Sequence, residues 1–144
     1  MYYVNREQIE RRLAYLSTVR ATLRLLRDKP PAESLIDRFA LERAIHVAAE
    51  CVTDIGSYII DGFVMRDAAS YEDIVDILFG EDVFSRELFE LLSPLVKMRK
   101  PLVQSYYDLN NHDLTTLSLQ LPEGLDRFTD SIVQYLSNEL GDNK

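Results

Sequence analysis

Residues 41–59 read LERAIHVAAECVTDIGSYI, and the spacing of the apolar residues in this stretch decides the fold. The apolar residues recur at alternating steps of four and three, at Leu41, Ile45, Ala48, Val52, Ile55 and Ile59. Such steps place side chains on one face of an α-helix, as in helices that pack against one another. We call these six residues the apolar stripe. The stripe predicts a long buried helix over roughly residues 32–60, ending at Asp61 and Gly62.

Other segments show helical spacing, and none alternates as a strand would. A first helix is expected over residues 5–27 and should end before Pro30 and Pro31. A short helix is expected over residues 71–79, with Ser70 as its N-cap and Gly80 at its exit. A further helix should begin after Ser85, its N-cap, and bend at Pro94. Pro101 should break the chain after this helix. A last helical region is expected over residues 114–140, divided by the segment from Pro122 to Gly124. The fold class is therefore all-α, a bundle of about five helices.

Length and composition are those of one globular domain covering residues 1–144, with 47% hydrophobic residues. The single cysteine, Cys51, excludes an internal disulfide and a cysteine-based zinc site. No apolar run is long enough to span a membrane, and the N-terminus lacks the apolar core of a signal peptide. We expect a cytoplasmic protein that requires no cofactor.

Charge is unevenly distributed. The net charge is −8, which argues against broad coating of nucleic acid. Residues 1–29 nevertheless hold seven Lys/Arg and three Asp/Glu, a net +4, so the remainder carries −12. Arg6, Arg20, Arg24 and Arg27 share one face of the first helix. A basic first helix can guide a phosphate or pair with another protein, and the charge alone favours pairing. The arginine face itself is interpreted either as a flank of the RNA groove or, more often, as a solvated face on which Arg20 extends past the edge of the core.

Residues 97–109 read KMRKPLVQSYYDL and form the most specific motif of the chain. Arg99 is followed by the apolar pair Leu102 and Val103, then by Gln104 and Tyr106. The motif resembles that of HepT-like proteins, helical members of the HEPN superfamily that include RNA-cleaving toxins. The family pattern is Arg-Asn, an apolar pair, then His-x-Tyr. Here Gln104 stands in place of the histidine and Lys100 in place of the asparagine.

The resemblance implies a homodimer whose groove, built from both protomers, places Arg99 on the scissile phosphate of an RNA substrate. A guanidinium suits this role because its planar donors match phosphate oxygens. The resemblance also implies that Tyr106 is modified with adenylate by a minimal nucleotidyltransferase antitoxin. Taken alone, Arg99 also fits a surface arginine near a helix C-terminus, and Tyr106 fits a half-buried tyrosine beside Tyr107.

Gln104 leaves the motif without its usual proton-transfer group. Cleavage of RNA without a metal needs a proton removed from the 2′-hydroxyl and one delivered to the leaving oxygen, and imidazole does this near neutral pH. A glutamine amide binds phosphate or base but does not titrate. His46 and His112 are the only histidines that could substitute, and His112 also fits an exposed turn or cap residue.

His46, Glu50 and Asp54 form a row at four-residue spacing, opposite the apolar stripe. One interpretation is a functional row facing Arg99, because the family carries acidic residues here. A second is a solvated face in which His46 and Glu50 form a helical pair. A metal site is the weakest interpretation, since one helix supplies only part of a coordination shell, and we expect no metal.

Together these observations favour the toxin component of a HepT-like toxin–antitoxin pair, a metal-independent ribonuclease of weakened or absent activity. Arg99, Gln104 and Tyr106 would form its catalytic motif, with Lys100, Glu50, Asp54, His46 and His112 as supporting candidates. The alternative is a non-catalytic helical dimer that acts as an interaction module for a nucleotidyltransferase partner. A helical dimer that binds a small molecule in an apolar cavity is a third interpretation.

Overall fold

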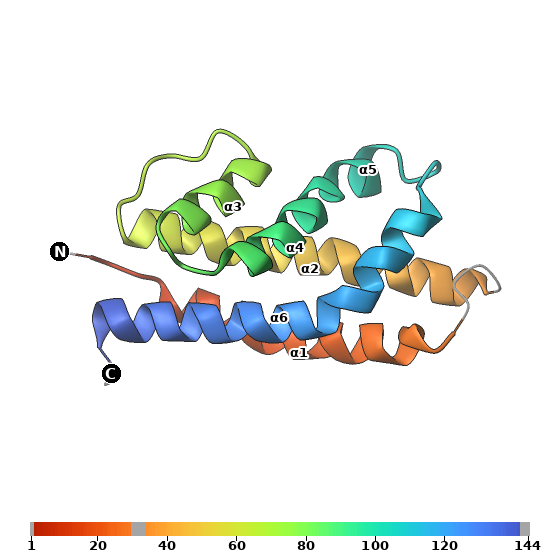
Figure 1. The fold of residues 1–144 in the computed structure, drawn as a ribbon, viewed down its shortest axis with the longest axis horizontal. Coiled ribbons are helices and arrows are strands. Elements are labelled where there is room, and N and C mark those ends of the chain that lie inside the picture. Colours follow the sequence, from red (N-terminus) through yellow and green to blue (C-terminus); the bar gives the residue numbers. More distant parts are fainter. Residues whose placement is uncertain (1, 30–33, 142–144) are drawn as a thin grey trace.

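The structure is a computed structural model that describes residues 2–29 and 34–141. Its helices are α1 (Arg6–Arg27), α2 (Leu35–Gly62), α3 (Tyr71–Gly80), α4 (Arg86–Lys97), α5 (Arg99–Gln104) and α6 (Asn111–Leu140) (Figure 1). The described residues contain no strand, which confirms the all-α class. Five of the helices have ten residues or more, as expected, and α5 has six. Pro30, Pro31 and Ala32 lie outside the described residues.

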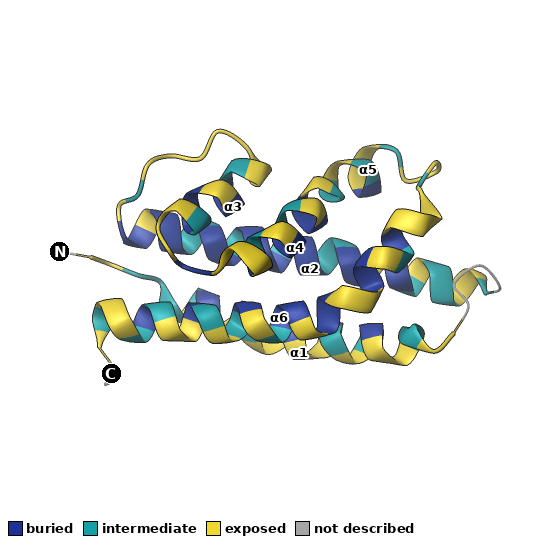
Figure 2. Ribbon diagram, viewed as in Figure 1, coloured by how far each residue is buried: buried dark blue, intermediate teal, exposed yellow. Residues whose placement is uncertain are grey.

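Helix α2 is the centre of the bundle. It packs against all five other helices. In Figure 1, α1 and α6 run alongside α2 on one side, and α3, α4 and α5 follow one another along its other side. Burial follows from this position, because a helix with neighbours on several sides has little surface left for solvent. Figure 2 shows the buried residues on the faces that the helices turn toward one another.

The apolar stripe is the core of α2, as its spacing predicts. All six of its residues are buried, and the most exposed, Leu41, has 4% of its surface accessible. The first turn of α2 is fixed by Ser34, whose hydroxyl accepts a hydrogen bond from the backbone N–H of Asp37. The expected start near residue 32 was thus slightly early, and the expected end at Gly62 is confirmed.

Truncation within the stripe should destabilise the fold. Val52 is fully buried, so Val52→Ala is expected to lower the free energy of unfolding by about 1–3 kcal/mol through lost burial and a small cavity. Glu42→Ala, on the polar side of the same helix, should change it by less than about 0.5 kcal/mol. Urea unfolding of both variants measures the difference. Equal losses at the two positions would contradict the central place of α2 in the core.

Two predicted N-caps are confirmed, and α3 ends at the expected glycine. Ser70 and Ser85 each accept a hydrogen bond from the backbone N–H three residues later, at the starts of α3 and α4. Helix α3 ends at Gly80, one residue beyond the expected end at Phe79, and Gly80 does not take the left-handed conformation of a glycine cap. The left-handed conformation falls instead on Asp82, with φ 60°, directly after the cap residue Glu81.

The expected division of the last helix is wrong. Helix α6 continues through Pro122 and Gly124, although Figure 1 shows that it bends along its length. Both residues are buried against neighbouring helices. A Cβ on Gly124 would lie 2.0 Å from Leu91 Cδ2, so the glycine allows α4 to approach α6 closely. Packing of α6 on α1, α2 and α4 therefore overrides two residues that usually interrupt a helix.

The break expected at Pro101 falls earlier, at Met98, between α4 and α5. Pro101 lies in the first turn of α5, where its missing N–H would have no partner within the helix in any case. Pro94 lies inside α4, and its effect on the helix axis remains a prediction.

The basic face of α1 is used within the fold. Arg20 and Arg24 both pair with Asp126 of α6, at 2.9 and 3.0 Å. Arg27 pairs with Glu123 at 2.9 Å. These ion pairs join the first helix to the last. Arg20, Arg24 and Arg27 are thus engaged within the chain, and the flank of a phosphate site stays a prediction.

An ion pair closes the connection between α2 and α3 and should make stability depend on pH. The guanidinium of Arg66 donates to both carboxylate oxygens of Asp73, at 2.7 and 2.8 Å, and the Ala69 N–H donates to the same carboxylate. These donors, Arg66 first, lower the pKa of Asp73 from 3.8 to about 2. Its contribution is therefore complete above the unfolded pKa of about 3.9 and is lost as pH falls through about 2.

Asp73→Asn should consequently lower the free energy of unfolding at pH 7. The difference from the native chain should shrink as pH falls below about 4. Urea unfolding series at several pH values measure this. Asp67→Asn is the matched control, and a difference between native chain and Asp73→Asn that stays constant with pH would contradict the ion pair.

Candidate functional site

Arg99, the first residue of α5, is held between two other helices. Its Nε donates a hydrogen bond to Oε2 of Glu50 in α2 at 2.5 Å, and its Cζ lies 3.8 Å from the ring centroid of Tyr71 in α3. Its side chain is 24% exposed and that of Glu50 is 35% exposed. A charge-assisted bond on one edge and a ring against its face leave the guanidinium with little freedom to turn.

The other edge of this guanidinium is free to bind a ligand. Within residues 2–29 and 34–141, neither Nη atom of Arg99 has a hydrogen-bond partner. Two parallel N–H donors on a fixed plane match two oxygens of a phosphate group. The arrangement can therefore bind an anion without first breaking the contact with Glu50.

His46 lies next to the same carboxylate. Its Nε2 is 3.6 Å from Glu50 Oε2, the oxygen that accepts from Arg99. Asp54, the third member of the row, instead accepts from Nε of Arg12 in α1 at 3.0 Å. The row is thus divided: His46 and Glu50 face Arg99, whereas Asp54 joins α2 to α1. No group of three potential metal ligands occurs among the described residues.

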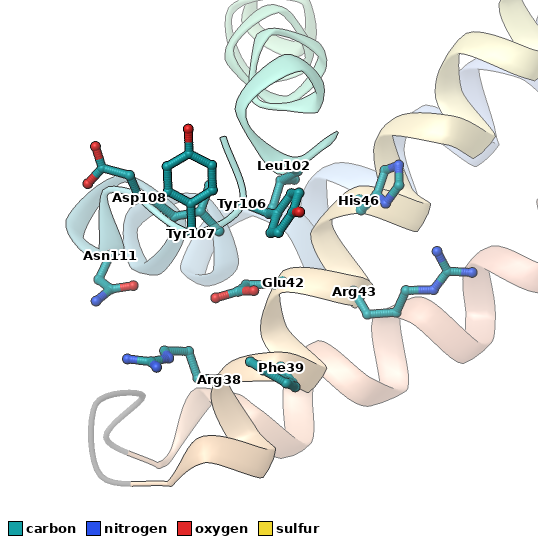
Figure 3. A pocket seen from close by; sticks show the side chains of 11 residues that line it. Arg38, Phe39, Glu42, Arg43, His46, Leu102, Tyr106, Tyr107, Asp108 and Asn111 are labelled. Carbon is teal, nitrogen blue, oxygen red and sulfur yellow. The ribbon is translucent and has the colours of Figure 1, made fainter. Parts of the chain in front are cut away.

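A groove of about 700 Å³ opens between the first half of α2 and the segment from α5 to the start of α6 (Figure 3). Tyr106 extends into it from the turn after α5, and His46 lies on the opposite wall (Figure 3). Tyr106 is 66% exposed, and its ring meets that of Tyr107 edge to face at 5.6 Å between centroids. The remaining lining residues include Arg38, Phe39, Glu42, Arg43, Asp108 and Asn111.

Gln104 and His112 lie apart from this cluster. Gln104 is the exposed last residue of α5, and neither it nor exposed Lys100 lines the groove. His112 lies in the first turn of α6 and lines a separate pocket of about 460 Å³ with Pro94, Met98 and Pro101. The structure therefore brings Arg99, Glu50 and His46 together around one carboxylate. His46 also shares the groove with Tyr106, whereas Arg99 and Glu50 do not line it. The structure does not place Gln104, Lys100, His112 or Asp54 with these residues.

Sequence reasoning missed Tyr71 and the arginine and aromatic residues of the groove, Arg38, Phe39 and Arg43. No local pattern marks Tyr71, because its contact with Arg99 joins two helices that are separate in the chain. The exposed residues Leu35, Ile36 and Phe39 at the start of α2 were a usable signal, since apolar side chains on a solvent face often mark a binding surface.

Cys51 carries no chemistry at this site. It is buried, and burial, with a smaller contribution from Asp54, raises the pKa of its thiol to about 11. A thiol that keeps its proton is a poor nucleophile. In the part of the chain that the structure describes, no helix has an apolar stretch long enough to cross a membrane.

Comparison with known proteins assigns the chain to a family. The model of the ribonuclease HepT-like family matches residues 13–132. The protein YutE of Bacillus subtilis strain 168, for which ribonuclease activity has been proposed, is 38% identical over 141 residues, covering 98% of this chain and 96% of YutE. The solved structure of YutE, described as a cytosolic protein of unknown function, superposes with a TM-score of 0.86 at 37% identity and covers 100% of this chain and 99% of YutE.

Two more distant structures share the fold. A toxin–antitoxin complex with AMP-PNP gives a TM-score of 0.82 at 16% identity, covering 89% of this chain and 98% of the matched one. A tri-AMPylated Shewanella oneidensis HEPN toxin in complex with its MNT antitoxin gives 0.80 at 17% identity, covering 88% and 97%. The family match and the extent of the likeness to YutE, taken together, show that this chain belongs to the HepT-like ribonuclease family.

Proposed function

We propose that this protein is the toxin component of a HepT-like toxin–antitoxin pair and cleaves RNA without a metal, at a rate weakened by the loss of the motif histidine. The observation that carries the proposal is Arg99, fixed by Glu50 and Tyr71 with its two Nη groups unbonded in the described structure. A preorganised cation of this kind stabilises the charge that develops on a pentacoordinate phosphorus. Gln104 would occupy the position of the lost acid–base group.

The proposed assembly is a homodimer, since two protomers are needed to form the family's groove and isologous dimers are the commonest oligomers. Light scattering at micromolar concentration should then give twice the chain mass of 16.6 kDa. A stable monomer throughout that range would remove a two-chain site from the proposal. The cytoplasm is the proposed location, in line with the description of YutE as cytosolic.

The proposed partner is a nucleotidyltransferase antitoxin that transfers adenylate from ATP to Tyr106, with pyrophosphate leaving. Support comes from the exposure of the Tyr106 ring and its position in the groove. Each adenylate would add a negative phosphate and a bulky base where an RNA strand would bind, and would block that strand by charge and volume.

This modification can be assigned by mass spectrometry after co-expression with the antitoxin. Tyr106→Phe should abolish a mass increase that Tyr107→Phe, the matched neighbour, leaves intact. Phenylalanine keeps the ring and removes only the acceptor oxygen, so the fold is preserved. Loss in the Tyr107→Phe variant alone would move the modified residue by one position.

The proposed ribonuclease activity is tested with labelled single-stranded RNA and purified protein in chelator. Slow cleavage giving a 2′,3′-cyclic phosphate and a 5′-hydroxyl is expected. No cleavage at any pH by a folded dimer would favour the second candidate, a non-catalytic dimer that serves as an interaction module. Gln104 is the observation that favours this second candidate, because an amide cannot transfer the proton.

A further inference from the structure

The two histidines of the chain have different surroundings. His112 lines a pocket with Pro94, Met98 and Pro101, and Arg99 does not line that pocket. His46 lines the groove that also contains Tyr106, and it neighbours the carboxylate that holds Arg99. Only His46 therefore lies both in an open groove and beside the candidate phosphate-binding cation.

We propose that His46 is the catalytic residue that transfers the proton which Gln104 cannot, and that the groove binds single-stranded RNA. This inference rests on the proposed ribonuclease function. Its geometric basis is a shared atom, Glu50 Oε2, which lies 2.5 Å from Arg99 Nε and 3.6 Å from His46 Nε2. The carboxylate thus places an imidazole and a guanidinium side by side. The His46 side chain is 26% exposed, which leaves it accessible to a ligand.

The lining of the groove fits an unpaired RNA strand. The rings of Tyr106 and Phe39 are 66% and 67% exposed, and exposed aromatic rings are the usual platforms for unstacked bases. Arg38 and Arg43 supply positive charge for the backbone phosphates, in a lining that also contains Glu42 and Asp108. Bases in a duplex are stacked on one another and could not meet these rings. The substrate class is therefore single-stranded RNA.

The chemical step balances without a metal. Neutral His46 accepts the proton of the 2′-hydroxyl at its unprotonated ring nitrogen, and the hydroxyl oxygen forms a bond to the phosphorus of the phosphate that Arg99 binds. The bond from phosphorus to the 5′-oxygen breaks, and that oxygen takes a proton from water. The resulting hydroxide removes the proton from His46. The products are a 2′,3′-cyclic phosphate and a 5′-hydroxyl end.

The charged and titratable groups that face His46 or share its groove come from three elements. They are Glu42, Arg43 and Glu50 of α2, Arg99 of α5, and, across the groove, Tyr106 and Asp108 of the following turn. Because the neutral form is the base, cleavage should rise with pH on the acidic side of the profile and then level off.

The test compares His46→Gln with His112→Gln, the matched control, in the labelled-RNA assay with chelator. His46→Gln should lower kcat by about 100-fold or more and remove the acidic limb of the pH profile, while KM changes little. His112→Gln should match the native chain. Thermal unfolding of both variants checks that the fold is unchanged.

A merely structural role of His46 predicts a different result when the same substitution is made beside Gln104→His. If His46 transfers the proton, the restored histidine should take over and the loss caused by His46→Gln should become much smaller. Equal losses in both backgrounds would show that His46 only supports Glu50 and would overturn the inference. Cleavage by His46→Gln at the native rate would also overturn the inference.

If the native chain itself does not cleave RNA, the proposed function is overturned, and this inference falls with it.

Discussion

Replacing Arg99 by alanine is expected to lower kcat/KM for RNA cleavage by about 100-fold or more, the usual cost of removing a preorganised donor from a developing anion. Arg99 is the one cation in the cluster whose plane is fixed on two sides, by Glu50 and by the Tyr71 ring. Its loss removes phosphate stabilisation and also leaves Glu50 facing the site with an uncompensated negative charge. Both effects act against an anionic substrate.

Arg127→Ala is the matched control. Arg127 lies on α6, is about half exposed and pairs with Glu87, away from the groove. Its removal should leave cleavage unchanged. Arg99→Lys should recover only part of the activity, because an ammonium keeps the charge but lacks the planar fork that contacts Glu50 and stacks on Tyr71. Cleavage by Arg99→Ala at the native rate, with native thermal unfolding, would remove Arg99 from the mechanism.

The central helix was predictable because its signal is local. The steps of four and three between Leu41 and Ile59 are fixed by the geometry of one helix, so burial of the apolar stripe follows without knowledge of any partner. The caps Ser70 and Ser85 are predictable for the same reason, since each bonds to an N–H three residues away.

The predictions that failed depended on packing between distant segments. Pro122 and Gly124 normally interrupt helices, but α6 is held by three neighbours and needs the glycine for contact with Leu91. The same limit applies to the candidate site. His46, Glu50 and Asp54 are equivalent in spacing, and only the positions of Arg99 and Arg12 separate them into two different contacts.

Gln104→His is expected to increase RNA cleavage. Restoring an imidazole to the motif supplies a second proton-transfer group, and such groups contribute about 100- to 10,000-fold. We expect a gain at or below the lower end of that range. Lys100 also departs from the family pattern, and Gln104 lies on the exposed end of α5 rather than in the groove with Tyr106. Small errors in the position of a proton-transfer group reduce its contribution strongly.

The pH profile and a second substitution show whether the gain comes from the intended chemistry. The part of the rate contributed by the new histidine should depend on a group that titrates near about 6 to 7, as an imidazole does. Arg99→Ala in the Gln104→His background should then abolish the gain, because proton transfer alone leaves the charged transition state unsupported.

Gln104→Asn, which changes the side chain without adding a titrating group, is the control and should give no gain. If a folded and dimeric Gln104→His variant cleaves no faster than the native chain at any pH, the site differs from an active ribonuclease by more than this residue. A native chain that is itself inert would then leave the interaction module as the better account of the protein.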